Sequence, residues 1–256
     1  MPRSSAYLAY GILAYLVFGA ALVWAFLFIG GLGPLPTVDQ GRPSWPVLIA
    51  VAVNLVLLGL FAVQHTVMAR PAFKRLESRL LPAGAERSTF VLAASLLLLL
   101  LFWQWRPLPA VVWDVRDPLA AGVLWGVYGF GWLFLVASTF MIDHLSLFGL
   151  RQAWLAARGR SAAPPSFRTA WLYAWIRHPI MTGFLILFWA TPHMTTGHLL
   201  FAGASSAYIL VGIWFEERDL LRAVPEYADY RRQVGGLVPK PPRAATPEAR
   251  PLRRPN

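Results

Sequence analysis

Four pairs of adjacent polar residues lie at the ends of long apolar stretches in this chain. They are Gln64–His65, Asp143–His144, Arg177–His178 and Glu216–Glu217. Ionisable groups are costly to desolvate at a membrane boundary and are rarely accidental in such numbers. Carboxylates, imidazoles and a guanidinium together can bind a charged cofactor and can take up a proton from a nucleophile. We therefore predict that all four pairs lie at one depth, in a polar chamber where a charged cofactor meets an apolar substrate.

The third pair is followed directly by Pro179. We predict one helix over residues 171–191, kinked at Pro179 because proline cannot donate to the carbonyl of Trp175. Gly183 follows one turn later and lets a ligand or a neighbouring helix come close. A simpler interpretation of Arg177 is a snorkelling side chain beside a hinge proline, with no role in a site.

The fourth pair ends the next apolar stretch. Carboxylates at a helix C-terminus oppose the helix macrodipole, which favours cations there. We therefore expect a compensating cation near Glu216 and Glu217, either Arg177 or a positively charged ligand. Further on, Tyr227 and Tyr230 are three residues apart and share a helical face, and Arg231 follows directly.

The elements that position these residues are membrane helices. The chain has 256 residues, of which 57% are hydrophobic and 14% charged, with a mean hydropathy of +0.52. Soluble domains carry about a quarter charged residues, so we predict an all-α polytopic integral membrane protein. Runs long enough to span a bilayer predict about six transmembrane helices, with five spans or a re-entrant hairpin left open because the last two runs are shorter or interrupted. The runs are residues 7–29, 45–63, 89–105, 119–142, 171–191 and 198–215.

The charge distribution predicts the orientation. With six spans, one side holds all but three of the 23 Lys and Arg residues and all but three of the 12 Asp and Glu residues. The whole net charge of +11 then faces this side, which the positive-inside rule assigns to the cytosol, with both termini. Segments 68–84 and 145–157 are amphipathic and predict helices lying on this inner surface.

The chain is predicted to hold one membrane-embedded domain, residues 1–235, whose part at 171–235 binds the cofactor. Residues 236–256 are rich in Pro and Arg and predict a disordered cytosolic tail. Topology and anionic lipid explain the basic charge better than nucleic acid does. The absence of cysteine excludes disulfides and thiolate metal sites, and no histidine spacing at the inner face predicts a metal.

The order of these motifs resembles the C-terminal signature of the isoprenylcysteine carboxyl methyltransferase superfamily, which are membrane enzymes that use S-adenosylmethionine. The matching residues are Arg177-His178-Pro179-Ile180-Met181-Thr182-Gly183, Glu216-Glu217, Tyr227 and Tyr230. Upstream stretches are most similar to a bacterial branch of the superfamily that methylates methanethiol, and the similarity runs from about residue 45 to 239. These stretches are residues 64–71, 102–107, 143–152 and 188–192.

This resemblance implies S-adenosyl-L-methionine as the cofactor and a set of residues that bind it. The residues carried over are Arg177, His178, Pro179, Gly183, Glu216, Glu217, Tyr227, Tyr230 and Arg231. Carboxylates suit the sulfonium and ammonium of this cofactor, a guanidinium suits its carboxylate, and aromatic rings suit its adenine. Two departures from the superfamily pattern are Met181, where tyrosine is usual, and Ala223-Val224 before the tyrosine pair.

The reaction that the resemblance implies is methylation of methanethiol to dimethyl sulfide, inside a bacterial inner membrane. Because the thiolate is the reactive form of a thiol, a base or a cationic pocket is expected to favour it, and the candidates are His65, Asp143 and His144. Asp143 cannot face its neighbour His144 on one helix, so we expect it to orient His65; helix-end polar groups are the simpler interpretation of all three. Alternatives left open are a prenylcysteine carboxylate or another lipid-like acceptor, a phospholipid methyltransferase or sterol reductase, and a transporter or scaffold.

Overall fold

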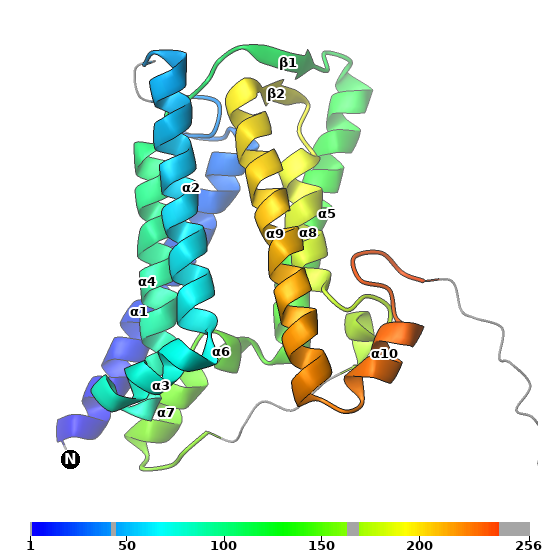
Figure 1. Cartoon of the computed structure of the whole chain (residues 1–256). Coiled ribbons are helices and arrows are strands. Elements are labelled where there is room, and N and C mark those ends of the chain that lie inside the picture. Colours follow the sequence, from blue (N-terminus) through cyan, green and yellow to red (C-terminus); the bar gives the residue numbers. More distant parts are fainter. Residues whose placement is uncertain (1, 42–44, 163–168, 241–256) are drawn as a thin grey trace, which may run out of the picture.

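Long helices standing side by side dominate the fold. The computed structural model describes residues 2–41, 45–162 and 169–240. Within these residues, five helices are long and apolar enough to cross a membrane (Figure 1). The prediction of an all-α polytopic membrane protein is confirmed. These helices are α1 (Pro2–Gly30), α2 (Val47–Ala69), α4 (Ala83–Gln104), α5 (Pro118–Ile142) and α9 (Thr196–Ala223).

Short elements mark the two ends of this bundle. Four short helices lie at the end that holds the N-terminus, whereas two strands pair antiparallel at the other end (Figure 1). Helices form in both segments predicted to be amphipathic. The short helices are α3 (Pro71–Leu80), α6 (His144–Leu147), α7 (Leu150–Ala157) and α10 (Tyr227–Gln233), and the strands are β1 (Val111–Asp114) and β2 (His193–Thr195).

The predicted kinked helix over residues 171–191 is wrong. The segment forms a 3-10 turn at Trp171–Ala174 and then α8 (Pro179–Trp189), with non-helical backbone between them. Proline disfavours helical backbone in the residue before it, and its missing N–H costs nothing in the first turn. Pro179 therefore begins a helix instead of bending one. Because α8 has 11 residues, it is about 16 Å long, well short of a bilayer core of about 30 Å.

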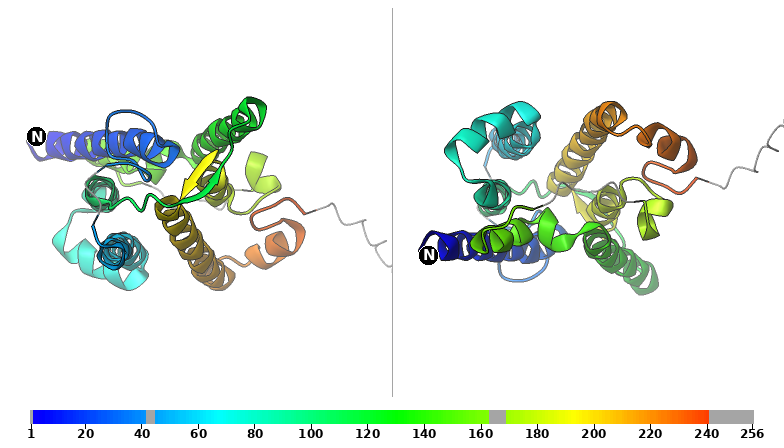
Figure 2. Two further views of the ribbon diagram at one scale, coloured as in Figure 1. Left: turned by 90° about the horizontal axis from the view of Figure 1, so that it is seen from above. Right: turned by 90° about the horizontal axis from the view of Figure 1, so that it is seen from below.

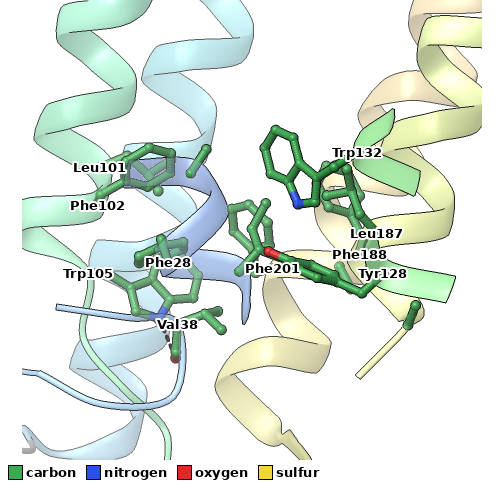
Figure 3. Packing of buried hydrophobic residues seen from close by; sticks show 14 of the residues in the cluster. Phe28, Val38, Leu101, Phe102, Trp105, Tyr128, Trp132, Leu187, Phe188 and Phe201 are labelled. Atoms are coloured by element: carbon green, nitrogen blue, oxygen red, sulfur yellow. Dashed lines mark hydrogen bonds between the residues drawn. The ribbon is translucent and has the colours of Figure 1, made fainter. Parts of the chain in front are cut away.

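The long helices form two groups. In one, α1 packs on α4 and α7, and α2 packs on α4; in the other, α8 packs on α5 and α9 (Figure 2). An aromatic cluster near the strand end joins the groups (Figure 3). Its ring centroids are 5.6 Å apart for Phe28 and Phe201, and 5.7 Å for Trp105 and Phe201.

Polar side chains buried near the strand end fix the loops there. Asn54 of α2 is fully buried, and its amide accepts from the backbone N–H of Arg106 at 2.9 Å and donates to the Arg106 carbonyl at 2.8 Å. The Trp105 indole donates to the Val38 carbonyl at 3.0 Å, which holds the loop between α1 and α2 against the bundle (Figure 3). A buried amide whose nitrogen and oxygen are both hydrogen-bonded in this way specifies one arrangement of helix and loop.

Candidate functional site

A buried ion pair lies where α8 begins. Arg177 donates to Oε1 of Glu217 from Nε at 2.8 Å and from Nη2 at 2.5 Å, and each side chain is 9% exposed. The prediction that the helix ends at Glu216 and Glu217 is wrong, because α9 continues to Ala223. The compensating cation predicted near these carboxylates is nevertheless present within the chain itself. Charge-assisted hydrogen bonds of this kind are among the strongest in proteins.

His178 lies between the two carboxylates. Its Nε2 is 3.1 Å from Oε1 of Glu217, and its Nδ1 is 3.6 Å from Oε2 of Glu216. The imidazole is 5% exposed, whereas the Glu216 side chain is 49% exposed. The two neighbouring glutamates thus have different surroundings: Glu217 is enclosed by the protein, and Glu216 is open on one side.

The backbone before α8 is held by residues 234–237, which we name the C-terminal strap. The N–H groups of Arg177 and His178 donate to the carbonyls of Gly235 and Gly236 at 2.8 and 3.1 Å. Thr182 of α8 donates from its hydroxyl to the Leu237 carbonyl at 2.8 Å. Residues 236–240 were predicted as the start of a disordered tail, and this is wrong for Gly236 and Leu237, which are hydrogen-bonded to α8. The rest of that tail, residues 241–256, lies outside the described residues.

Arg177 also binds the C-terminal strap through its side chain. Its Nη1 donates to the carbonyls of Arg231, at 3.2 Å, and Val234. Because Nε and Nη2 serve Glu217, each nitrogen of the guanidinium has an acceptor within the protein. Arg177 therefore fixes Glu217 and the strap relative to each other, and its donors are largely committed to that task.

The tyrosines of α10 close this arrangement. The Tyr230 hydroxyl donates to the Tyr173 carbonyl at 2.5 Å, and Tyr227 is 1% exposed with its ring centroid 5.8 Å from that of Tyr230. Burial raises the pKa of Tyr227 to about 12, helped by Glu217, and burial raises the pKa of Tyr230 to about 12. Arg231 reaches Oε2 of Glu217 from Nε at 3.0 Å. Both tyrosines stay neutral at physiological pH.

Pro179 and Gly183 have structural tasks. Pro179 begins α8 and is buried. A Cβ on Gly183 would lie 2.8 Å from Cβ and 3.0 Å from Cα of Leu135 in α5. Of the two partners allowed by the sequence, a ligand or a helix, the structure places the helix α5 against Gly183.

His65 lies on α2 among aromatic rings. Its ring centroid is 5.3 Å from that of Phe61 and 4.9 Å from that of Phe90. Its Nδ1, like Oε1 of the neighbouring Gln64, is buried without a hydrogen-bond partner among the described residues. An unpaired buried acceptor or donor is unfavourable, so these two atoms are suited to a ligand or water.

Asp143 does not orient His65 as predicted. It accepts from the Ser146 hydroxyl at 2.8 Å and from Arg151 at 2.6 Å, and it caps α6 by accepting from the Ser146 N–H. Partial burial favours the neutral acid, but these hydrogen bonds outweigh it and lower the pKa of Asp143. The interpretation of Asp143 as a helix-end polar group is the one that the contacts support.

His144 is likewise held by neighbouring residues. Its Nε2 is 2.8 Å from the Tyr15 hydroxyl, and its Nδ1 is 2.8 Å from the Thr139 hydroxyl. Since Thr139 donates to the Val136 carbonyl at 2.7 Å, it accepts from Nδ1, and Nε2 accepts from Tyr15 in the neutral ring. Burial lowers the pKa of His144. This chain of hydrogen bonds links α1 to α5.

The four polar pairs do not form one cluster of contacting residues. Arg177–His178 and Glu216–Glu217 meet, whereas the contacts of the other two pairs are made with α1, α2, α4, α5, α6 and α7. The sequence reasoning missed the C-terminal strap, Thr182 and Tyr173. The sequence signal that could have revealed the strap is the pair Gly235-Gly236, because adjacent glycines often mark a tight turn. In the structure a Cβ on Gly235 would lie 1.8 Å from the Val238 carbonyl oxygen, so only glycine fits this turn.

A comparison with protein families decides where this chain belongs. The model of the NnrU protein family matches residues 53–236, which run from α2 to the C-terminal strap. The chain belongs to the NnrU family. The matched stretch includes the ion pair Arg177–Glu217, His178 and both tyrosines of α10.

Several curated relatives of this NnrU-family chain carry the name of an enzyme. It is 54% identical to methanethiol S-methyltransferase from Mycobacterium tuberculosis, over 91% of this chain and 96% of that protein. It is 53% identical to methanethiol S-methyltransferase 2 from Bradyrhizobium diazoefficiens, over 92% of this chain and 90% of that protein. It is also 30% identical to nurim from Mus musculus, over 68% of this chain and 69% of that protein. No solved structure matches. The resemblance to membrane methyltransferases is confirmed.

Proposed function

We propose that this chain is a membrane methyltransferase that converts methanethiol to dimethyl sulfide, with S-adenosylmethionine as the methyl donor. The observation that carries the proposal is the identity of more than half of the residues to proteins named methanethiol S-methyltransferase, along nearly their whole length. The ion pair of Arg177 and Glu217 lies inside the family match. We place the site on the cytosolic side of a bacterial inner membrane, which the concentration of Lys and Arg near it supports.

The donor set of the site fits the proposed cofactor. When bound, S-adenosylmethionine supplies an electrophilic methyl group on a sulfonium. Glu216 is the carboxylate best suited to a ligand cation, because its side chain is 49% exposed and Nδ1 of His178 is 3.6 Å away. Both oxygens of Glu217 are taken by Arg177, His178 and Arg231. We infer that Glu217 holds the elements of the site together and that Glu216 contacts the positive charge of the cofactor.

Arg177 supports the site as a positioning residue. Its side chain joins Glu217 to the carbonyls of Arg231 and Val234, so it holds α10 and the C-terminal strap over the beginning of α8. The same covering of the site by α10 involves Tyr227 and Tyr230 of α10 and Pro179 at the start of α8. Gly183 supports the site by letting α8 pack closely on α5. A site held closed by such contacts excludes water, which strengthens the electrostatic interactions inside it.

Of the three residues proposed as the base, His65 is the one that the contacts favour. Its unpartnered Nδ1 leaves one ring nitrogen free of protein contacts among the described residues, and an imidazole can take the thiol proton. Asp143 and His144 are the weaker candidates, since each side chain is engaged by neighbours. The thiolate of methanethiol is the nucleophile that such a base would provide.

The deciding experiment gives methanethiol and methyl-labelled S-adenosylmethionine to membranes that contain the protein, and traps the headspace. Labelled dimethyl sulfide is the expected product. Label in lipid or in prenylated peptide would assign the alternative acceptor, and no transfer at all would overturn the proposal. Glu216→Gln is expected to weaken cofactor binding at least tenfold, whereas Asp219→Asn, a nearby carboxylate paired with Arg70 at 2.9 Å, serves as the matched control.

A further inference from the structure

A polar pocket lies beside α10, next to the candidate site. It has a volume of about 420 Å3 and is lined by Leu221, Ala228, Arg231, Arg232 and Lys240. Ala228 and Arg232 share one face of α10 by their spacing, and Arg231 lies between this face and the one that carries Tyr227 and Tyr230. Three of the five lining residues are cations, and the other two are apolar.

The cations are held in place by neighbours. The Lys240 ammonium donates to the carbonyls of Arg231 and Arg232 at 3.3 and 3.4 Å, so it sits over the end of α10. Arg232 pairs with Asp229, and Arg231 pairs with Glu217. The side chains of Arg231 and Arg232 are 48% and 67% exposed, so their remaining donors reach the pocket.

An apolar stripe on α9 leads to this pocket. Trp214, Arg218 and Leu221 lie on one helical face; Trp214 is 58% and Leu221 41% exposed. The Arg218 guanidinium lies 5.6 Å from the centroid of the Trp214 ring. Exposed tryptophan beside basic residues, near the end of a membrane-spanning helix, is typical of the lipid headgroup region. Leu221 belongs to both the stripe and the pocket, so the pocket opens at headgroup depth.

We propose that this pocket binds the phosphate of an anionic phospholipid, with the acyl chains lying along Trp214 and Leu221. Arg232 and Lys240 supply donors to the phosphate, and the exposed α9 face supplies the apolar contact. Through Arg231, which also reaches Glu217, the lipid site adjoins the candidate cofactor site without sharing its other residues. The proposal stands independently of the methyl acceptor.

Native mass spectrometry of the full chain in detergent tests this. Phosphatidylglycerol is expected to bind more tightly than phosphatidylcholine. Each basic residue near a membrane surface is worth roughly fivefold in anionic-lipid affinity, so Arg232→Gln/Lys240→Gln is expected to weaken phosphatidylglycerol binding roughly 25-fold. Arg232→Lys/Lys240→Arg, which keeps the charges, is expected to retain it.

The matched control is Lys74→Gln/Arg75→Gln on α3, which removes the same charge at the same end of the bundle and is expected to have little effect. An equal loss in this control would overturn the proposal, because binding would then follow net charge alone. Equal affinity of the unaltered protein for the two lipids would overturn it without any variant. Displacement of phosphatidylglycerol by an equal concentration of inorganic phosphate would also overturn it, in favour of a soluble anion.

Discussion

Arg177 directs two nitrogens to a single oxygen of Glu217, at 2.8 and 2.5 Å, and His178 approaches the same oxygen to 3.1 Å. The other oxygen of Glu217 accepts from Arg231 at 3.0 Å. Four donor atoms from three residues thus converge on one buried carboxylate. Glu217 therefore connects the start of α8, the C-terminal part of α9 and α10, and the neighbouring Glu216 remains half exposed.

Glu217→Ala is expected to destabilise the protein strongly. Removing one partner of a buried ion pair leaves an uncompensated charge and costs about 3 kcal/mol or more. Thermal unfolding of the detergent-solubilised protein measures this loss. Glu216→Ala is expected to change stability little, because its side chain is 49% exposed; equal destabilisation by both variants would contradict the division of tasks between the two carboxylates.

Gly183→Ala is expected to separate α8 from α5. The new Cβ would lie 2.8 Å from Cβ of Leu135, and such overpacking typically costs about 1–3 kcal/mol. Gly203→Ala on α9 is the matched control, since nothing lies within 4 Å of a Cβ built there. Alanine is the better helix former, so this control is expected to keep or slightly raise the midpoint of thermal unfolding.

Asn54→Leu is expected to loosen the strand end of the bundle. The substitution leaves the N–H and carbonyl of Arg106 without their side-chain partner, at a cost of about 1–3 kcal/mol for each buried group left unpaired. Faster amide exchange at residues 105–108, read by hydrogen–deuterium exchange, is the expected sign. Val56→Ala, at a position that is 60% exposed, is expected to leave that exchange unchanged.

Acidification is expected to weaken the link between α1 and α5 through His144. Burial lowers the pKa of His144 in the folded protein, so the unfolded chain takes up a proton first as the pH falls. Stability from this group is therefore complete above about pH 6.5, the ordinary value for histidine, and decreases below it. The midpoint of thermal unfolding, compared at pH 7.5 and 5.5, is expected to fall less in His144→Gln than in the unaltered protein.

Much of the membrane architecture follows from composition and run length. The five long helices end within a few residues of the predicted spans or extend beyond them, because uninterrupted apolar runs admit few alternatives to a helix in lipid. The segment at 171–191 misled the prediction, since length and hydropathy are shared by a kinked span and by a turn followed by a short helix. A proline in the middle of an apolar run is compatible with a kinked helix and with the start of a new one, and only the backbone conformation before it distinguishes the two.

The candidate site was predictable only in part. The convergence of Arg177, His178 and the two glutamates follows from an apolar hairpin that returns to the same face. Which acceptor each hydrogen-bond donor of the site binds could not be predicted, because this depends on where the backbone carbonyls of residues 231–237 lie. The link proposed between Asp143 and His65 failed for the same reason: Arg151 and Ser146 are closer partners of Asp143 along the chain, and local partners prevail over distant ones.

The C-terminal strap has a consequence for synthesis in the cell. A nascent chain that stops before residue 234 can already hold every long helix described here, yet it lacks the Val234 carbonyl that Arg177 binds and the residue Gly235 that pairs with Ile176. Arg177 and Glu217 would then meet without a cover. Insertion into the bilayer and completion of the candidate site are thus separate events during synthesis, and the second must wait until residues 234–237 have been added.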